Sequence, residues 1–223
     1  MTKIEALSRK TKEKELRKQL ILAAAKELFF EHSYEKTSMD AIAQKVGLAK
    51  GTLYLYFSNK DELYISLLNE GLTILKEMMV AKGKLFDNPE DKFVHSLAIA
   101  YYEFSVEHPQ YFSLMMNFHT GNIAKMDCVH EDVTGEIVQK DTELLQYCMS
   151  IVQEGIDFGV FITSEDPRLV VMQLWFSIFG AIVMMRYHCA SEELLKEHDP
   201  LLGINQKSII ESIANRFVKS LKI

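Results

Sequence analysis

The stretch from Lys50 to Phe57 gathers the side chains of this sequence that are best suited to recognition chemistry. One ammonium, one hydroxyl and two phenol groups lie close together there, and each can donate hydrogen bonds to phosphate oxygens or to the edges of bases. Chemistry of this kind binds a polyanion without transforming it. The sequence contains no phosphate-cradling glycine loop, no nucleophile elbow and no HExxH pattern, so nothing in it recommends an enzyme or a cofactor.

Two short helices must position these groups. Thr37 or Ser38 is a good N-cap for a helix that ends at Gly47, the residue type that most readily takes the left-handed conformation at a helix end. A second short helix is expected to follow, as far as Phe57. The residues expected to wedge between the two helices are Ile42, Val46 and Leu53, while the small Ala43 allows a close crossing. This layout is typical of a helix-turn-helix over residues 38–57, whose second helix enters the major groove of DNA.

Helical periodicity runs through the rest of the chain and predicts an all-α fold. From Leu16 to about His32 apolar residues recur at three- and four-residue intervals, whereas Thr2–Lys14 lacks that pattern and is expected to be a frayed arm. Ser58 or Asn59 caps a connecting helix that is expected to reach about residue 82. Further helices are expected at 90–107, 109–118, 123–158, 167–188 and 206–221.

Charge is distributed unevenly along the chain. The formal net charge of the 223 residues is −6, yet residues 1–60 hold 12 Lys and Arg against 7 Asp and Glu. A basic N-terminal region on an acidic body suits a protein that meets a polyanion at one end, although a solvated basic arm explains the same numbers. The three cysteines form no CxxC, and the opening residues carry charges where a signal peptide is apolar. We therefore expect a cytoplasmic protein with reduced thiols.

One segment, Leu169–Met185, contains 17 residues without a formal charge. This length is at the short limit for a membrane span, and Gln173, Ser177 and Gly180 interrupt it. We therefore expect a buried or interface helix and no membrane association, with a membrane anchor as the alternative.

A long series of positions in the N-terminal third agrees with one known family. These positions are Ile21–Ala25, Leu28–Phe29, Tyr34, Thr37–Ser38, Ile42–Ala43, Val46–Gly47, Gly51–Tyr54, Tyr56–Phe57 and Lys60–Leu63. Residues 15–75 thereby resemble the TetR family of transcriptional regulators. The resemblance implies a three-helix helix-turn-helix DNA-binding domain at 15–75, joined by a connecting helix to a larger helical ligand-binding and dimerisation domain at 76–223. It also implies a homodimer that binds a pseudo-palindromic operator in double-stranded DNA.

The resemblance further implies which residues touch DNA. They are Thr37, Ser38, Lys50, Gly51, Thr52, Tyr54, Tyr56 and Lys60. Hydroxyls and backbone N–H groups at the first two can hold a phosphate, the two lysines can reach phosphates, and Thr52 can read a base. Simpler roles stay open: the Thr–Ser pair can be a helix cap alone, and the tyrosines can be core. Phe57 is expected to pack inward.

Two positions depart from the family pattern. The residue after the first helix is usually glycine and is Ser33 here, which costs about 1 kcal/mol if that site needs a positive φ. The residue before the recognition helix is commonly Ser or Thr and is Ala49 here, and loss of that cap typically costs about 1 kcal/mol.

The larger domain is expected to bind a small molecule and to dimerise. Met and aromatic side chains can line an adaptable pocket for a lipophilic or aromatic effector, although each of them can also be ordinary core. The pocket candidates are Tyr101, Phe104, Met115, Phe118, His119, Cys148, Met172 and Trp175. The dimer surface is expected on the last two helices, at Trp175, Phe179, Gly180, Val183, Ile210, Ile213 and Phe217.

Together these expectations describe a ligand-responsive, sequence-specific DNA-binding regulator, a repressor that a small molecule releases from its operator. The alternative is a ligand-sequestering protein that has lost DNA binding, which Ser33 and Ala49 allow and the intact Gly51–Phe57 run opposes. No metal site is expected, because Asp127–Asp132 holds ligand types without a recognised spacing.

Overall fold

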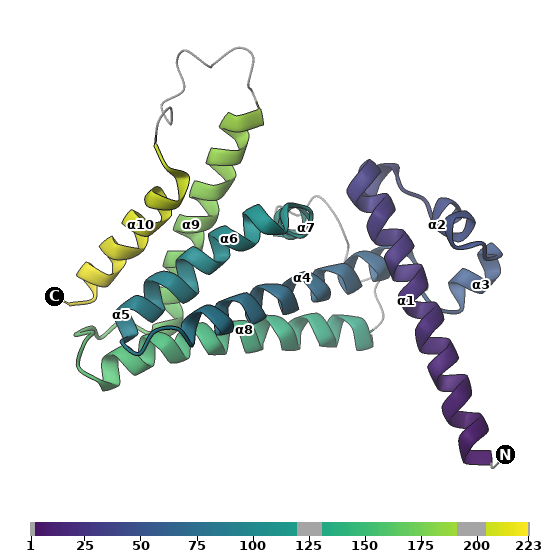
Figure 1. Ribbon diagram of the computed structural model, residues 1–223, viewed down its shortest axis with the longest axis horizontal. Coiled ribbons are helices and arrows are strands. Elements are labelled where there is room, and N and C mark those ends of the chain that lie inside the picture. Colours follow the sequence, from purple (N-terminus) through teal and green to yellow (C-terminus); the bar gives the residue numbers. More distant parts are fainter. Residues whose placement is uncertain (1–2, 120–130, 191–203, 223) are drawn as a thin grey trace. The chain divides into compact units, whose positions relative to one another are not determined.

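A computed structural model describes residues 3–119, 131–190 and 204–222 of the chain. Within these ranges every regular element is a helix, which confirms the predicted all-α fold (Figure 1). The chain divides into two compact units, which we describe separately. The head unit comprises Met1–Gly71 and Gln110–Gln139, and the body unit comprises Leu72–Pro109 and Lys140–Ile223. The predicted domain boundary at residue 75 stays a prediction. Of the segment Asp127–Asp132, for which no metal site is expected, residues 127–130 lie outside the described ranges.

The helix-turn-helix lies in the head unit. It is built from α1 (Lys3–Lys36), α2 (Met39–Val46), α3 (Lys50–Tyr54) and the first half of α4 (Lys60–Gly83). These helices bury a shared set of apolar side chains: Ile21, Ala25, Phe29, Ile42, Ala43, Leu53, Phe57 and Leu63. Asn59 caps α4, since its Oδ1 accepts a hydrogen bond from the Glu62 N–H at 2.8 Å, and the Glu62 carboxylate accepts one from the Ser58 N–H.

The first helix begins earlier than the sequence pattern predicts. The frayed arm predicted for Thr2–Lys14 is wrong from Lys3 onward, because α1 is helical from that residue. Lys, Glu, Arg and Leu dominate this stretch and are good helix formers. Pairs four residues apart add to the helix, including the Arg17–Glu13 ion pair at 3.0 Å. The side chains of Arg9 and of Thr11–Lys14 are exposed, and a helix face in water needs no apolar periodicity, so the pattern could not reveal it.

Two later segments complete the head unit: most of α7 (Pro109–His119) and the start of α8 (Glu131–Asp157). The Tyr64 hydroxyl on α4 donates to the Leu114 carbonyl oxygen on α7 at 2.6 Å. The ring of Tyr111 meets that of Phe30 on α1 edge to face, with centroids 5.3 Å apart. Gly71 permits this approach of α7 to α4, because a Cβ there would lie 3.1 Å from the Tyr111 ring. These contacts tie α7 to both α1 and α4.

The body unit contains the second half of α4 and most of α8, together with α5 (Pro89–Asp91), η1 (Lys92–Ile99), α6 (Ala100–Glu107), α9 (Pro167–Ala190) and α10 (Gln206–Ser220). The sequence predicts an ordinary helix over 90–107, whereas η1 is π-helical, with wider turns. Six of its eight side chains are buried. A π-helical segment retains enough of the helical apolar pattern to be taken for an α-helix in the sequence.

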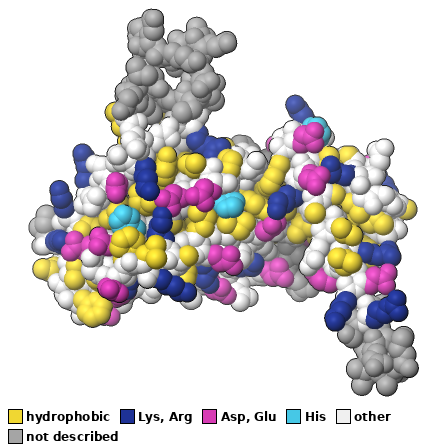
Figure 2. All heavy atoms as spheres, in the orientation of Figure 1, with side chains coloured by type: hydrophobic (Ala, Val, Ile, Leu, Met, Phe, Trp, Pro, Cys, Tyr) yellow, Lys and Arg dark blue, Asp and Glu magenta, His cyan; other side chains and the backbone are white. Residues whose placement is uncertain are grey.

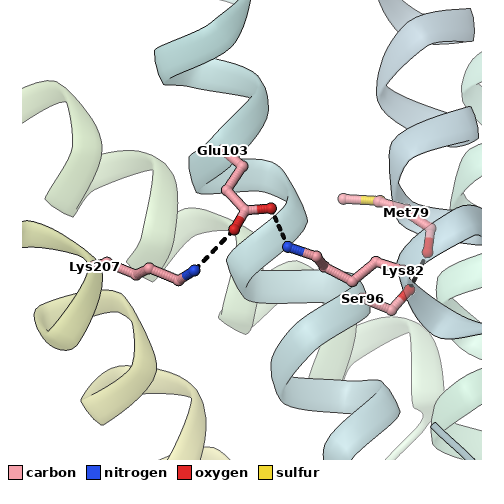
Figure 3. Close-up of polar contacts among 5 residues, drawn as sticks. All are labelled: Met79, Lys82, Ser96, Glu103 and Lys207. Carbon is pink, nitrogen blue, oxygen red and sulfur yellow. Dashed lines mark hydrogen bonds and ion pairs between the residues drawn. The ribbon is translucent and has the colours of Figure 1, made fainter. Parts of the chain in front are cut away.

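Two polar contacts fix the last turns of α4 inside the body unit (Figure 3). The Ser96 hydroxyl on η1 donates to the Met79 carbonyl oxygen at 2.7 Å, and the Tyr147 hydroxyl lies 2.9 Å from Ser96 Oγ. The Glu103 carboxylate on α6 pairs with Lys82 on α4 and, at 2.9 Å, with Lys207 on α10. Glu103 therefore links three helices of this unit.

The helix α9 contains the uncharged run. In the part of the chain that the structure describes, its segment Pro167–Arg186 is the one helix long and apolar enough to cross a membrane by length and composition. Core helices of soluble proteins meet the same criterion, and a third of the most apolar window is buried inside the protein. The predicted interface role of this helix stays a prediction.

Candidate nucleic-acid interface

The turn between α2 and α3 has the geometry that the sequence predicts. Ser38 caps α2, with its hydroxyl oxygen accepting a hydrogen bond from the Ala41 N–H at 3.1 Å. Gly47 ends the helix at a φ of 74°, and the Leu48 N–H returns to the Ala43 carbonyl oxygen at 2.9 Å. The chain is thereby turned sharply into the recognition helix α3.

The helix α3 buries one edge and presents the other to solvent. Leu53 and Phe57 are fully buried, which confirms the inward packing predicted for Phe57. Lys50 and Gly51 are exposed, Thr52 and Tyr56 are half-buried, and Tyr54 is 43% exposed. The helix starts at Ala49 without a side-chain cap, as expected from the absence of Ser or Thr. The exposed edge is short, polar and held on a rigid support.

Lys50 is oriented by a carboxylate that the sequence reasoning missed. Its Nζ lies 2.7 Å from Asp40 Oδ1, so an ion pair bridges α2 and α3 on the surface. The hydrogen bond and the charge of Asp40 raise the pKa of Lys50, which keeps it protonated. An approaching phosphate would compete with Asp40 for this ammonium. The ten-residue separation crosses a turn, so only the folded structure reveals the pair.

Thr37 faces the interior of the head unit. Its side chain is buried, and its hydroxyl donates to the carbonyl oxygens of Ser33 at 2.8 Å and Leu28 at 3.2 Å. These bonds hold the end of α1 where the chain leaves the helix. The hydroxyl of Thr37 therefore has its partners within the protein, and the DNA surface proposed below begins at Ser38.

Lys60 also points inward. Its Nζ donates to the carbonyl oxygens of Tyr34 at 2.7 Å and Thr37 at 2.9 Å, and it lies 3.9 Å from the centre of the Tyr34 ring. Burial lowers the pKa of Lys60. The Tyr34 hydroxyl donates to Asp61, and burial together with this bond raises the pKa of Tyr34. Lys60 thus braces the segment before α2, and it is left out of the proposed phosphate contacts.

The pocket candidates are divided between the two units. Met115 and Phe118 belong to the head unit, and the side chain of His119 lies outside the described residues. The candidates in the body unit are Tyr101, Phe104, Cys148, Met172 and Trp175. Phe104 and Cys148 are fully buried, and burial raises the pKa of the Cys148 thiol. Those two side chains behave as core, whereas Met172 and Trp175 are half-buried.

Trp175 carries the one unusual polar atom among these candidates. Its indole Nε1 is buried and has no hydrogen-bond partner in the described part of the protein. A buried N–H without an acceptor costs free energy, of the order of 1–3 kcal/mol. An acceptor supplied by a bound molecule would remove that cost.

The predicted dimer residues are not equally accessible. Ile210 is fully buried inside the body unit, so its side chain is not available to a second copy. Trp175, Phe179, Val183, Ile213 and Phe217 are half-buried, and Gly180 is exposed. The largest exposed apolar side chains on α9 were not predicted: Phe176 is 67% exposed and Met184 is 56% exposed.

On α10 a groove of about 410 Å³ runs along the outer face, lined by Ile204, Ser208, Ile209, Ser212, Ile213 and Arg216.

Two short crossed helices joined by a glycine turn, on a support of buried apolar residues, define a helix-turn-helix protein. Residues 21–67 match the model of the bacterial regulatory proteins of the tetR family. The chain is 30% identical over 190 residues to the HTH-type transcriptional regulator YhgD of Bacillus subtilis (strain 168), covering 83% of this chain and 87% of that protein. The chain therefore belongs to the TetR family and is a transcriptional regulator.

Two further comparisons concern a fatty acid metabolism regulator and a transcriptional regulator named FadR. The fatty acid metabolism regulator protein of Bacillus subtilis (strain 168) is 28% identical over 167 residues, covering 73% of this chain and 77% of that protein. The solved structure of the transcriptional regulator FadR from Bacillus subtilis in complex with stearoyl-CoA has a TM-score of 0.66 at 20% identity. That likeness covers 92% of this chain and 98% of FadR, and it shows a shared fold.

Proposed function

We propose that this chain is a cytoplasmic, sequence-specific DNA-binding repressor that a long-chain acyl-CoA releases from its operator. The observation that carries the DNA-binding part is the polar edge of α3, where Lys50 and Tyr54 are exposed and Thr52 is half-buried, beside the buried Leu53 and Phe57. One helix of this kind contacts few base pairs. A homodimer that places two such helices in successive major grooves, about 34–36 Å apart, supplies the remaining affinity.

Each exposed residue has a distinct role in this proposal. Ser38 and the N–H groups at the start of α2 hold a phosphate, and Lys50 exchanges Asp40 for a phosphate or a guanine edge. Thr52 contacts a base, and Gly51 lets the backbone approach closely, since no side chain occupies the open space above it. Tyr54 and Tyr56 direct their hydroxyls to the backbone of the DNA.

Two observations support the effector class. The relatives named above include a fatty acid metabolism regulator, and the structure with the same fold contains stearoyl-CoA. In this chain the buried Trp175 Nε1 needs an acceptor, which a thioester carbonyl oxygen provides. The acyl chain would lie along Met and aromatic side chains, whose shapes adapt to a flexible ligand.

Release from DNA follows if the effector binds more tightly to the shape that cannot engage the operator. A hundredfold preference for that shape corresponds to about 2.7 kcal/mol of coupling free energy, which is within the usual range for allosteric proteins. The effector must therefore contact the two shapes differently, and tight binding by itself would change nothing.

The experiment starts from a pool of random duplexes, from which the full-length protein selects its preferred sequence. We expect one pseudo-palindromic sequence to be enriched, and we expect Lys50→Ala combined with Tyr54→Ala to weaken binding to it at least tenfold. The exposed Lys84→Ala serves as a control in the body unit. Unchanged affinity of the double variant would refute the assigned recognition edge, and a pool without enrichment would refute sequence-specific binding.

The effector is tested separately with stearoyl-CoA, using coenzyme A as the control. Trp175 is the one tryptophan of the chain, so its fluorescence reports on this position alone. We expect stearoyl-CoA to change the fluorescence and to release the selected duplex, and coenzyme A to do neither. Release of the duplex without a change in fluorescence would mean that the effector binds at a place other than Trp175. No release would overturn the effector class and leave the DNA-binding part intact.

A further inference from the structure

The N-terminal half of α1 carries a basic stripe that the recognition edge does not include. An α-helix turns by about 100° per residue, so Lys14, Arg17 and Lys18 lie within about 60° of the direction of Ile21. Ile21 is fully buried in the head unit. The side of α1 that is apolar where it meets the core therefore becomes basic where the helix extends beyond the core.

The described side chains in this part of α1 are free of the core. Those of Arg9 and of Thr11–Arg17 are all exposed, and Lys18 is half-buried. From Ile21 back to Arg9 the helix rises about 18 Å, at about 1.5 Å per residue. Figure 2 shows dark-blue Lys and Arg side chains flanking the described part of this segment, at the lower right. Side chains exposed in this way contribute little to holding the core together.

One contact places the stripe beside the recognition helix. The Lys18 Nζ lies 5.7 Å from the centre of the Phe57 ring, and Phe57 follows α3 by three residues. The stripe thus starts next to the end of the segment that carries Tyr54 and continues away from it along α1. Glu13 lies at the edge of the stripe and pairs with Arg17 at 3.0 Å. Because this carboxylate competes for Arg17, Lys14 and Lys18 are the residues of the stripe best placed to bind phosphate.

We propose that Lys14, Arg17 and Lys18 form a second DNA-binding surface, which holds phosphates of the duplex flanking the sequence that α3 reads. The inference rests on the proposed function, because it needs the head unit to be docked on DNA. Lysine and arginine side chains spaced by three and four residues match a polyanion, and phosphate contacts add affinity without adding sequence preference. This surface would therefore increase affinity for long duplexes and leave the selected sequence unchanged.

The test uses the duplex selected by the full-length protein, with about 10 base pairs of added flank on each side or with none. We expect Lys14→Gln/Arg17→Gln/Lys18→Gln to bind the flanked duplex about tenfold more weakly than the unaltered protein at moderate salt. On the trimmed duplex the two proteins should bind equally. The slope of log affinity against log salt should fall by about two to three for each head, since each phosphate contact contributes about 0.9.

Lys12 supplies the matched control. It lies about 180° from Ile21 on the same exposed helix, so Lys12→Gln removes the same charge from the opposite face. We expect Lys14→Gln to weaken binding to the flanked duplex and Lys12→Gln to leave it unchanged. The charge-conserving double variant Lys14→Arg/Lys18→Arg should retain full binding. Far-UV circular dichroism checks that each variant keeps its helical content. Equal losses for Lys12→Gln and Lys14→Gln would overturn the proposal, because the effect would then come from net charge alone.

Other outcomes separate the inference from the proposed function. If the triple variant binds the flanked duplex as tightly as the unaltered protein, the stripe is not a DNA surface, whereas the recognition edge stands. If the triple variant loses binding to phosphatidylserine vesicles and keeps its DNA binding, the stripe serves a membrane surface and the proposal is overturned. A random pool that yields no preferred duplex overturns the proposed function and this inference together.

Discussion

Ser33 keeps its backbone in a conformation that other residues rarely adopt, with φ at 71° and ψ at 166°. This region is almost restricted to glycine, because a Cβ there crowds the adjoining peptide group. The strain persists because the surrounding polar contacts fix the segment after α1: Thr37 holds the Ser33 carbonyl oxygen, and Lys60 holds the next one. The sequence made a cost conditional on a positive φ at this position, and the structure has that positive φ.

We predict that Ser33→Gly stabilises the protein by about 1 kcal/mol, because the strain disappears. The exposed hydrogen bond from Ser33 Oγ to Glu35 is lost in the exchange, and it offsets only part of the gain. The midpoint of urea unfolding, followed by circular dichroism, measures the change. Gly47→Ala is the converse control: it places a Cβ at a φ of 74° and should lower stability by a similar amount. A lower midpoint for Ser33→Gly would contradict this account.

The polar residues of the head unit illustrate what spacing alone can predict. Lys50 and Tyr54 are exposed and Thr52 is half-buried, while their role in DNA recognition stays a prediction. Thr37 and Lys60 have the same polar character but find partners inside the protein. Their orientation depends on the path of the chain after α1, which a positive φ at Ser33 sets. No helical pattern encodes that path.

At the scale of elements, Glu103 joins α4, α6 and α10 within the body unit through its two lysine partners (Figure 3). Burial by itself would raise the pKa of Glu103, but hydrogen bonds from Lys82 and Lys207 outweigh it and leave the pKa below its ordinary value. The carboxylate therefore contributes stability above the pKa it has in the unfolded chain, about 4.3. That contribution disappears as the pH falls through the lower folded-state pKa.

We predict that Glu103→Gln lowers the free energy of unfolding by about 1–2 kcal/mol at neutral pH. The difference between the variant and the unaltered protein should shrink as the pH falls from about 4.3 through the lower folded-state pKa, below which Glu103 is neutral in both states. Urea unfolding of both proteins at a series of pH values measures this difference in the free energy of unfolding. Glu165→Gln, an exposed change of the same type in the body unit, should show no such dependence. A difference that stays constant down to low pH would contradict the assignment of the loss to this carboxylate.

The helices themselves were predictable to different degrees. Amphipathic helices with caps, such as α2 and α10, follow from their sequence, because an apolar face and a capping side chain are local signals. The N-terminal half of α1 lacks an apolar face, and η1 differs from an α-helix only in the width of its turns. In both cases the deciding property does not appear in the apolar spacing.

At the scale of the whole molecule, α9 exposes one very large apolar side chain. Phe176 is 67% exposed, which is costly in water. A second copy of the same helix would cover such a surface with its own, as a twofold interface requires.

We predict that Phe176→Glu converts the protein into a monomer, because each interface would bury two like charges. Light scattering after size-exclusion chromatography gives the mass directly. The monomer should bind the selected duplex at least tenfold more weakly, since one head engages one half-site. Leu85→Glu adds the same charge at an exposed apolar position outside α9 and α10, and it should stay dimeric. A dimeric Phe176→Glu, or unaltered protein that requires detergent to dissolve, would contradict this use of α9.

By itself the sequence determined the helical class and the helix-turn-helix, because those depend on caps, a glycine turn and apolar spacing within about twenty residues. The tertiary structure alone decided which polar groups face inward, as Lys60 and Thr37 do, and which apolar ones face outward, as Phe176 does. It also showed that the basic stripe of α1 continues the direction of the buried Ile21. Burial depends on neighbours that are distant in sequence, and local periodicity carries no record of them.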